Sequence, residues 1–334
     1  MNTLSPISSP PGRSRIDFYG PIVRDLEEVE LILKQTYESP RVVVNRLTAH
    51  LEHYRGKRLR PALLLLTARA CECITPAHHT LGAVVEMIHT ATLVHDDVLD
   101  EATVRRHVPT VNADWGNQTS ILLGDFLFTH AFHLASTLDD VQACRIIGEA
   151  TNRVCEGELQ QGSERGNLAL SEQLYFDIID GKTAELTSCC CRLGALYSGA
   201  SPEVVEALSD YGRWLGMAFQ IADDLLDLVG QEQTTGKSLG TDVDQQKLTL
   251  PLIHLLNVAP VETVAKVRQI LMSPANHKRS MLEPYLADSG SLNYAGSRAE
   301  EFAARARADL DCLPPSECRF ILENLTERVI HRHY

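Results

Sequence analysis

Apolar residues recur at helical spacing along almost the whole chain after residue 20. Residues 26–33 and 42–51 are two amphipathic runs of this kind near the start. The pairs Thr75–Pro76 and Ser201–Pro202 each place a capping hydroxyl directly before a proline, which is typical of the first turn of a helix. Strand signals are nearly absent, because β-branched runs are short and no Asn-Gly or Asp-Gly turn joins alternating segments. The pattern predicts an all-α fold of about a dozen helices.

The same pattern predicts one domain preceded by a short tail. Residues 1–20 are rich in Ser, Pro and Gly and are expected to form a flexible N-terminal tail. Residues 21–334 contain no Pro/Gly/Ser-rich linker, and a hydrophobic content of 44% favours one large core. Within this domain, residues 162–170 are expected to be an ordinary polar loop. Residues 229–246 form a connection long enough to be a lid, a binding loop or disordered.

Composition and charge narrow the class of protein. The formal net charge is −13 and no Lys/Arg-rich run is present, so no nucleic-acid partner is expected. The nine cysteines lack the CxxC spacing of zinc sites and no signal peptide precedes them, which indicates reduced thiols in a cytoplasmic protein. The apolar segments "PALLLLTARAC" and "LGAVVEMIHTATLV" are too short or too interrupted to span a bilayer, although transient membrane contact stays open.

The stretch "LVHDDVLDEATVRRH", residues 93–107, concentrates charge at the end of an apolar run. On a helix, Asp96 and Asp100 share one face, and Asp97 lies about 100° away. Neighbouring carboxylates repel each other, by about 4 kcal/mol at a separation of about 4 Å and an effective dielectric of about 20. One interpretation is a solvated acidic helix end. The other is a site for a hard cation such as Mg²⁺, which prefers carboxylate oxygens.

A second copy of this spacing favours the cation site. Asp223, Asp224 and Asp227 repeat the DDxxD pattern in "FQIADDLLDLVG", again among apolar residues. A single DDxxD arises easily by chance, but a matched pair in apolar helices does not. The two motifs are expected to face each other across a cavity and to hold several Mg²⁺ ions between them.

Basic residues accompany the first acidic motif. In "GKRLRP", Lys57 and Arg60 are three apart on one helical face, and Arg58 lies between them. Arg105 and Arg106 follow the motif by about one and a half helical turns. Guanidinium groups present a planar donor fork that suits phosphate oxygens, and a lysine adds a point charge. This set predicts a clamp for phosphate groups.

Other candidates have an equally plausible structural role. His89 lies two helical turns before Asp96 and is either a ligand or a satisfied core histidine. Lys182 with Thr183 in "GKTAEL", and Lys237 and Lys247 around the long connection, add cations near the second motif. Each lysine alone is more commonly a surface residue than a ligand. Together, two acidic and two basic clusters indicate chemistry on two phosphorylated substrates, with departure of diphosphate as the step they would assist.

At this point the chain resembles the trans-isoprenyl (polyprenyl) diphosphate synthases, and most closely the long-chain octaprenyl type. The resemblance covers residues 22–334, and its motifs occur in the family's order: "GKRLRP", "EMIHTATLVHDDVLDEATVRRH", "GDFLFTHAF", "GKTAEL", "FQIADDLLD" and "GKSLGTD". It implies the all-α isoprenoid synthase fold with a central active-site cavity, a homodimer and a Mg²⁺-dependent prenyltransferase. The two substrates would be isopentenyl diphosphate and an allylic diphosphate.

The resemblance also implies a role for each motif residue. Both aspartate motifs are expected to bind Mg²⁺ on the allylic diphosphate, and the remaining residues to bind the two substrates. The isopentenyl diphosphate set is Lys57, Arg60, His89 and Arg106; the allylic set is Arg105, Lys182, Thr183, Gln220 and Lys237, with Lys247 as a weaker match. Thr183 and Gln220 are expected near the cation that forms. The implied reaction is ionisation, condensation and elimination, without a protein nucleophile.

Product length is expected to depend on the residues about one turn before the first aspartate. Ala91 and Thr92 occupy these positions, and because both are small, a long product for a quinone side chain is favoured. Replacing Ala91 by Phe is expected to shorten it. Alternatives are a shorter-chain geranylgeranyl or farnesyl diphosphate synthase, a non-catalytic subunit that binds prenyl diphosphates, and a terpene cyclase. The cyclase would not need the basic set for a second diphosphate.

Overall fold

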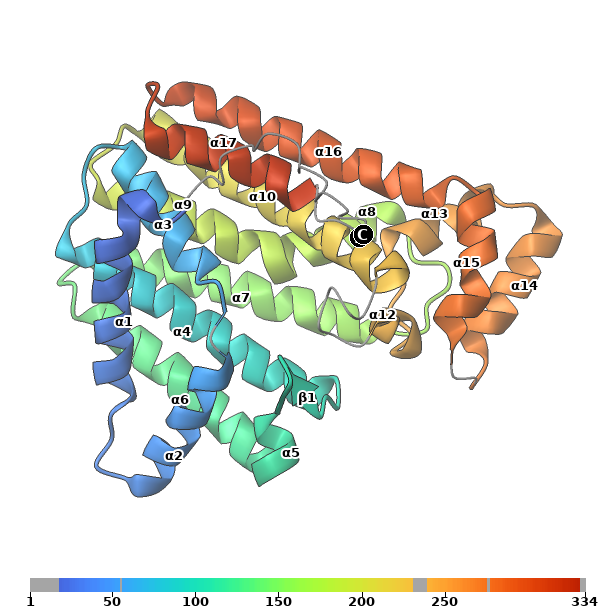
Figure 1. Ribbon diagram of the computed structural model, residues 1–334, viewed down its shortest axis with the longest axis horizontal. Helices are drawn as coiled ribbons and strands as arrows, with labels where there is room; N and C mark the ends of the chain where they lie inside the picture. The colour runs from blue at the N-terminus through green and yellow to red at the C-terminus, as the bar shows by residue number, and fades with distance from the viewer. Residues whose placement is uncertain (1–17, 55, 231–238, 275–276, 331–334) are drawn as a thin grey trace, which may run out of the picture.

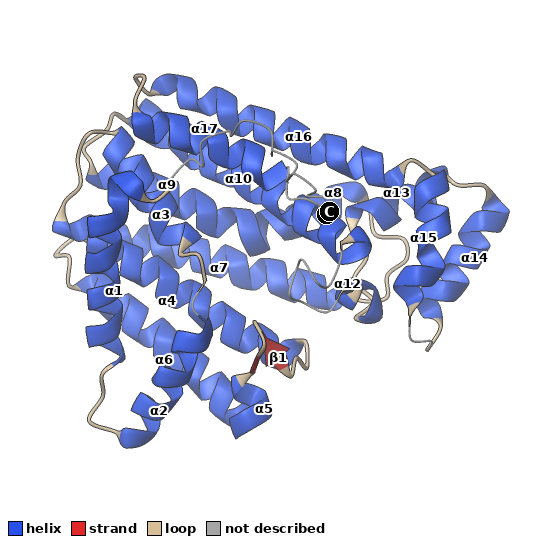
Figure 2. Ribbon diagram, viewed as in Figure 1, coloured by secondary structure: helices blue, strands red, loops and turns tan. Residues whose placement is uncertain are grey.

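The computed structural model describes residues 18–54, 56–230, 239–274 and 277–330. Within these ranges nearly all regular structure is helical, which confirms the all-α prediction (Figure 2). The helices are α1 (Val23–Tyr37), α2 (Val42–Leu51), α3 (Leu59–Ala70), α4 (Pro76–Leu99), α5 (Val111–Trp115), α6 (Asn117–Ser136), α7 (Val141–Ser163), α8 (Glu172–Ile179), α9 (Glu185–Tyr197), α10 (Pro202–Val229), α12 (Thr241–Asp244), α13 (Leu250–Val258), α14 (Val261–Met272), α15 (Lys278–Asp288), α16 (Ser291–Asp309) and α17 (Glu317–Ile330). No helix among the described residues is long and apolar enough to cross a membrane.

The helix starts expected from the sequence are present. Helix α4 begins at Pro76 with a capping box between Thr75 and His78. Helix α10 begins at Pro202, and the Ser201 hydroxyl accepts a hydrogen bond from the backbone of the first turn. These caps satisfy backbone donors that the first turn of a helix cannot pair internally.

The long helix α10 runs through the middle of the bundle and packs against α9 and α16, while α4 packs against α3 and α6 (Figure 1). Buried residues from α1 to α17 form one continuous core. A smaller cluster lies between α2, α4, α5 and α6 and contains Ala91 and Val94 of α4. The two acidic motifs therefore sit on helices that are fixed on several sides by packing.

The last residues of the expected N-terminal tail pack against the folded chain. Residues 1–17 lie outside the described residues, but Phe18 and Tyr19 already pack against the core. The Arg328 guanidinium lies 4.7 Å from the centre of the Phe18 ring, and the Tyr19 hydroxyl donates a hydrogen bond to the Lys57 carbonyl at 2.6 Å. Residues 18–20 thus belong to the folded chain, because they contact both helix α17 and the segment before α3.

A small β-hairpin follows the first acidic motif, where helix was expected. Helix α4 ends at Leu99, and strands β1 (Val104–Arg105) and β2 (Val108–Pro109) pair antiparallel. Arg106 and His107 form the turn with φ of 52° and 67°. A two-residue turn with positive φ at both positions matches the right-handed twist of a hairpin, although it costs energy for residues other than glycine. The arginine pair is therefore held on a rigid turn.

Between α8 and α9 the helix widens into one π-helical turn, Asp180–Ala184. Here the backbone of α7 comes unusually close, because Gly157 and Gly181 face each other. A Cβ atom added at Gly157 would lie 2.6 Å from the backbone nitrogen of Lys182. Ion pairs from Arg153 to Asp180 and to Glu185 hold the two ends of the segment. A π-turn of this kind often marks a functional site, and this one carries Lys182 and Thr183.

Candidate active site

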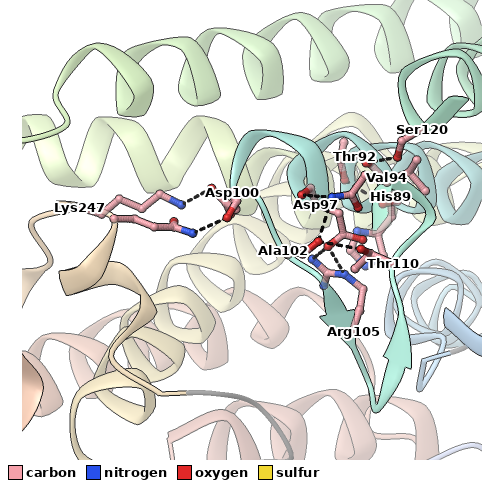
Figure 3. Close-up of polar contacts among 12 residues, drawn as sticks. His89, Thr92, Val94, Asp97, Asp100, Ala102, Arg105, Thr110, Ser120 and Lys247 are labelled. Carbon is pink, nitrogen blue, oxygen red and sulfur yellow. Dashed lines mark hydrogen bonds and ion pairs between the residues drawn. The ribbon is translucent and has the colours of Figure 1, made fainter. Parts of the chain in front are cut away.

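The first acidic motif divides its three carboxylates between two directions. Asp96 lies on α4 and Asp100 caps its C-terminal end, one turn further on the same face. Asp97 is turned away, with a side chain only 1% exposed, and accepts a hydrogen bond from Arg105 Nε at 2.8 Å (Figure 3). Asn112 donates to the backbone carbonyl of Asp97 at 3.2 Å. Asp97 thus pairs with the hairpin arginine, and its expected role as a metal ligand stays a prediction.

The second motif divides in the same way. The Asp224 side chain is buried in the protein, where Tyr175 donates to Oδ2 at 2.6 Å and Gln220 donates to Oδ1 at 2.7 Å. Burial raises the pKa of Asp224 well above its ordinary value, and Asp242 adds to this shift, while the two hydrogen bonds oppose it. Asp224, like Asp97, is therefore engaged by side chains inside the protein, and its expected metal role stays a prediction.

Asp227 is held by the backbone at the start of α12. The backbone N–H groups of Gly240 and Asp242 donate to its carboxylate, each at 3.1 Å, and the Thr241 hydroxyl donates at 3.0 Å. Burial raises the pKa of Asp227, although the hydrogen bonds from Asp242 and Thr241 act against it. The segment that follows the long connection is thereby fixed to the second motif. Residues 231–238 of that connection, including the candidate Lys237, lie outside the described residues.

Lys182 lies between the motifs. Its ammonium pairs with Glu158 of α7 at 2.8 Å and donates to Gln161 at 2.9 Å. Burial disfavours its charged form, but Glu158 and Asp96 outweigh burial, so that the pKa of Lys182 is raised. Burial, opposed by Lys182, raises the pKa of Asp96 to about 6. Burial also raises the pKa of Asp242, to about 7, and the neighbouring Asp227 adds to this shift.

A second lysine reaches the first motif from the segment that follows α12. Lys247 Nζ lies 3.0 Å from Asp100 Oδ1, and Gln245 donates to the Asp100 backbone carbonyl at 3.2 Å (Figure 3). Arg165 reaches the same carboxylate oxygen at 3.0 Å. The polar loop 162–170, predicted to be ordinary, therefore contributes to the site. Lys247 is a weaker match to the family pattern, and the structure pairs it with the first motif.

A dense group of cations adjoins the first motif. Burial lowers the pKa of His89 well below its usual value, and Arg60, Arg105 and Arg106 lower it further, which keeps the imidazole neutral. Burial also lowers the pKa of Arg60. The Nε of Arg60 is buried and has no hydrogen-bond partner among the described residues. Unpaired buried donors near like charges are expected where an anion binds.

The "GKRLRP" segment and the hairpin are in contact. A Cβ atom at Gly56 would lie 2.6 Å from Nη2 of Arg106, so the missing side chain makes room for that guanidinium. Arg58, in contrast, is taken up by the fold: it pairs at 2.6 Å with both Glu30 and Glu86, and these ion pairs raise its pKa despite burial. Lys57 next to it has an exposed side chain. Arg60 and Arg106 thus both lie near His89, and Lys57 belongs to the same segment as Arg60. The guanidinium of Arg58 is instead occupied by its two ion pairs.

The two predicted chain-length residues lie in different surroundings. Ala91 is fully buried in the smaller cluster, against side chains of α2, α5 and α6. Thr92 is partly exposed and shares the helical face of His89 and Asp96, and its hydroxyl donates to the His89 carbonyl at 2.8 Å (Figure 3). The role of both residues in product length stays a prediction. The enclosed cavity expected beside Thr92 stays a prediction.

The donor set fits Mg²⁺. The candidate ligands in the two acidic motifs are carboxylate oxygens. Among the described residues, no group of three or more His, Cys, Asp or Glu is arranged to hold a metal ion. Mg²⁺ is commonly bound by one or two carboxylates together with the phosphates of a substrate, so that a complete protein cage is not required. Cysteine takes no part, because Cys189, Cys190 and Cys191 are buried in the core.

Sequence reasoning missed several residues of this site. They share the role of holding a predicted residue in place and are Glu158, Gln161, Arg165, Tyr175, Gln245 and Asp242. Only Asp242 carried a usable signal, since it ends the quoted motif "GKSLGTD". The others come from segments without a charge pattern, and their partners are set by how the helices pack.

Comparisons with known proteins agree with this arrangement. The family model "Polyprenyl synthetase" matches residues 42–286. The octaprenyl diphosphate synthase of Escherichia coli (strain K12) is 36% identical over 312 residues, covering 92% of this chain and 96% of that protein. A decaprenyl diphosphate synthase from Rhodobacter capsulatus has a similar structure, with a TM-score of 0.89, 36% identity, and coverage of 94% of this chain and 98% of that one.

A polyprenyl synthase from Caulobacter crescentus CB15, solved with calcium and isoprenyl diphosphate, gives a TM-score of 0.91 at 33% identity, over 97% of this chain and 100% of that chain. Paired acidic motifs on two packed helices, a neighbouring cluster of cations and this likeness in sequence and structure define the class. The chain belongs to the polyprenyl synthetase family, and it is an enzyme of the prenyltransferase type.

Proposed function

We propose that the protein condenses isopentenyl diphosphate with an allylic diphosphate to make a long-chain all-trans polyprenyl diphosphate. The observation that carries this proposal is that two acidic motifs lie beside two sets of cations. One set is around Lys182 and Lys247, and the other is around Arg60 and His89. Two separate cation sets suit two diphosphates. The identity to an octaprenyl diphosphate synthase supports a long product.

In this proposal each cation set binds one substrate. Arg60, with the neutral His89, Lys57 and Arg106, would bind isopentenyl diphosphate, since an unpaired buried guanidinium nitrogen awaits an acceptor there. Lys182 and Lys247 would bind the allylic diphosphate between the motifs. The prenyl part would extend along the α4 face of Thr92.

We infer that Mg²⁺ is the metal and that Asp96, Asp100, Asp223 and Asp227 would hold it. When bound, Mg²⁺ would neutralise the oxygens of the diphosphate leaving group as negative charge accumulates on them. The protein side chains would orient the two substrates, and Thr183 with Gln220 would face the allylic cation. The final proton would pass to the departed diphosphate, so that no protein nucleophile is needed.

The proposal extends to assembly and location. Helix α6 exposes Ile121 and Leu122, which are 45% and 60% accessible, and a second copy of the chain would cover them in a homodimer. All nine cysteines are free thiols, which suits the reducing cytoplasm. The product would serve as a quinone side chain. Light scattering of the purified protein would test the dimer, and a monomer at micromolar concentration would contradict it.

The decisive experiment is product analysis. Purified protein should convert isopentenyl diphosphate and farnesyl or geranyl diphosphate, in the presence of Mg²⁺, to products longer than geranylgeranyl diphosphate. A product that stops at geranylgeranyl or farnesyl length would instead support the shorter-chain alternative. Absence of Mg²⁺-dependent diphosphate release, alone and with candidate partner subunits, would support the non-catalytic one.

A matched pair of variants tests the product channel. Thr92→Phe should shorten the product, because the ring would project from the face shared with His89 and Asp96. Ala91→Phe should instead destabilise the fold, since its ring would have to enter a closely packed cluster. If Ala91→Phe folded normally and shortened the product, Ala91 would limit product length, as expected from the sequence.

A further inference from the structure

Four side chains connect α8 to the π-helical turn by way of α10. The Tyr175 hydroxyl donates to Asp224 Oδ2 at 2.6 Å, and Gln220 Nε2 donates to Asp224 Oδ1 at 2.7 Å. The Thr183 hydroxyl in turn donates to Gln220 Oε1 at 2.7 Å. Tyr175, Asp224 and Thr183 are only 3%, 5% and 7% exposed. Short bonds between buried groups make this row a rigid unit.

The direction of each hydrogen bond in the row follows from the one before it. Asp224 accepts one bond on each oxygen, from Tyr175 and from Gln220. The amide nitrogen of Gln220 faces Asp224, and its carbonyl oxygen faces Thr183. Since Thr183 has a single hydroxyl proton and donates it to Gln220, its oxygen has only lone pairs left for other partners.

We propose that Tyr175 and Asp224 are positioning residues that set the polarity of Thr183 toward the allylic cation. This inference rests on the proposed function, in which Thr183 faces that cation. An oxygen whose lone pairs point at a developing positive charge stabilises it, whereas a hydroxyl proton pointing there would oppose it. Asp224 thus acts through Gln220 and is not a metal ligand, although it belongs to a DDxxD motif.

A double-mutant cycle between Tyr175→Phe and Thr183→Val tests this proposal. The row joins the two side chains through Asp224 and Gln220, and Thr183→Val removes the hydroxyl with little change in shape. Tyr175→Phe should lower kcat on the order of 10-fold, and its KM for both diphosphates and its Mg²⁺ half-saturation should stay unchanged. In the Thr183→Val background the same change should have almost no further effect on kcat, because the group it acts on is gone.

Tyr211→Phe is the matched control. Tyr211 lies on α10, is fully buried, and donates its hydroxyl to the Leu322 carbonyl at 2.9 Å, away from the row. Its replacement should lower thermal stability about as much as Tyr175→Phe does and leave kcat as in the wild type. If Tyr175→Phe fails to fold, Asp224→Ala takes its place in the cycle, because it removes the acceptor that orients Gln220.

The outcomes separate this proposal from the proposed function. If the two single losses in kcat multiply in the double variant, the positioning role is wrong. It is also wrong if Tyr175→Phe raises the Mg²⁺ half-saturation severalfold, because Asp224 would then be part of the metal site. Both results leave an active wild-type enzyme and the proposed function intact. A wild type without condensation activity would overturn both.

Discussion

At the end of α4 the carboxylates of Asp97 and Asp100 meet side-chain cations, whereas at the end of α10 those of Asp224 and Asp227 meet uncharged donors. Arg105 pairs with Asp97, and Lys247 and Arg165 pair with Asp100. In the second motif the donors are a tyrosine, a glutamine, a threonine and backbone N–H groups; they are Tyr175, Gln220, Thr241, Gly240 and Asp242.

The difference shows that one sequence pattern can be built with two kinds of support. Side-chain cations compensate the charge of the first motif and connect it to the hairpin and to the segment after α12. Dipoles compensate the second motif, and burial there still raises the pKa of Asp224 and Asp227. What the motifs share is the geometry: the second aspartate faces inward, and the first and third, which are four residues apart, share a helical face.

The largest effect is expected when a carboxylate of the shared face is removed. Asp96→Ala should lower turnover on the order of 10²- to 10³-fold, since the metal-supported stabilisation of the leaving group is lost. The fold should keep its stability, because the substitution relieves crowding with Glu158 and Asp100. Steady-state kinetics and thermal unfolding measure the two effects. The exposed Glu101 is the control: Glu101→Ala should be fully active, and near-normal activity of Asp96→Ala would remove it from the metal site.

The segment between the motifs should be the next most sensitive. Gly157→Ala places a Cβ 2.6 Å from the Lys182 backbone nitrogen and must displace the π-helical turn. We expect a loss of about 1–3 kcal/mol in the free energy of unfolding and a clear drop in kcat, because Lys182 and Thr183 move with the turn.

The same helix offers a matched control for that prediction. A Cβ at Gly148 meets nothing within 4 Å, so Gly148→Ala should stabilise α7 by up to about 1 kcal/mol and leave kcat unchanged. Equal urea-unfolding curves for the two variants would show that the close approach of α7 has no importance for the turn.

A pair of isosteric changes addresses the two kinds of support directly. Asp97→Asn leaves Arg105 without its counter-charge and should cost about 1–3 kcal/mol in the free energy of unfolding. Asp224→Asn should cost less, since the amide oxygen can accept from Gln220 and the Tyr175 hydroxyl can rotate to accept from the amide nitrogen. Urea denaturation of both variants measures this. A greater loss for Asp224→Asn would mean that uncharged donors hold the second motif more tightly than cations hold the first.

Much of this arrangement could be predicted from the sequence, for physical reasons that differ between residues. Helical periodicity and capping pairs such as Ser201–Pro202 act over a few residues, so α10 and its acidic motif were predictable. The separation of Asp96 and Asp97 by about 100° was also in the pattern. The different surroundings of these two carboxylates could not be predicted. The partner of Asp97 lies in a hairpin for which the sequence has no turn signal.

Residues that act through tertiary packing left no local pattern. Tyr175 resembles any core tyrosine until α8 is placed against α10, and Arg165 lies in a loop that resembles many polar loops. Lys247 was underrated for the same reason, since its contact with Asp100 joins positions far apart in the chain. The small residues Gly56 and Gly157 became informative only when the groups that approach them were known.

The smallest effect concerns the hairpin that carries the arginine pair. His107 has a φ of 67°, a region that costs a non-glycine residue about 1–2 kcal/mol, and glycine is the residue that adopts it freely. His107→Gly should therefore raise the free energy of unfolding. The gain should not exceed about 1 kcal/mol, because the higher entropy of glycine in the unfolded chain offsets part of it. His107→Asn should give a smaller gain, since asparagine tolerates this region better than most residues. Thermal unfolding of the three proteins would show the order Gly, Asn, His; a destabilised glycine variant would mean that the histidine side chain holds the turn. Because the hairpin supports only the first motif, neither change should alter the contacts of Asp224 or Asp227.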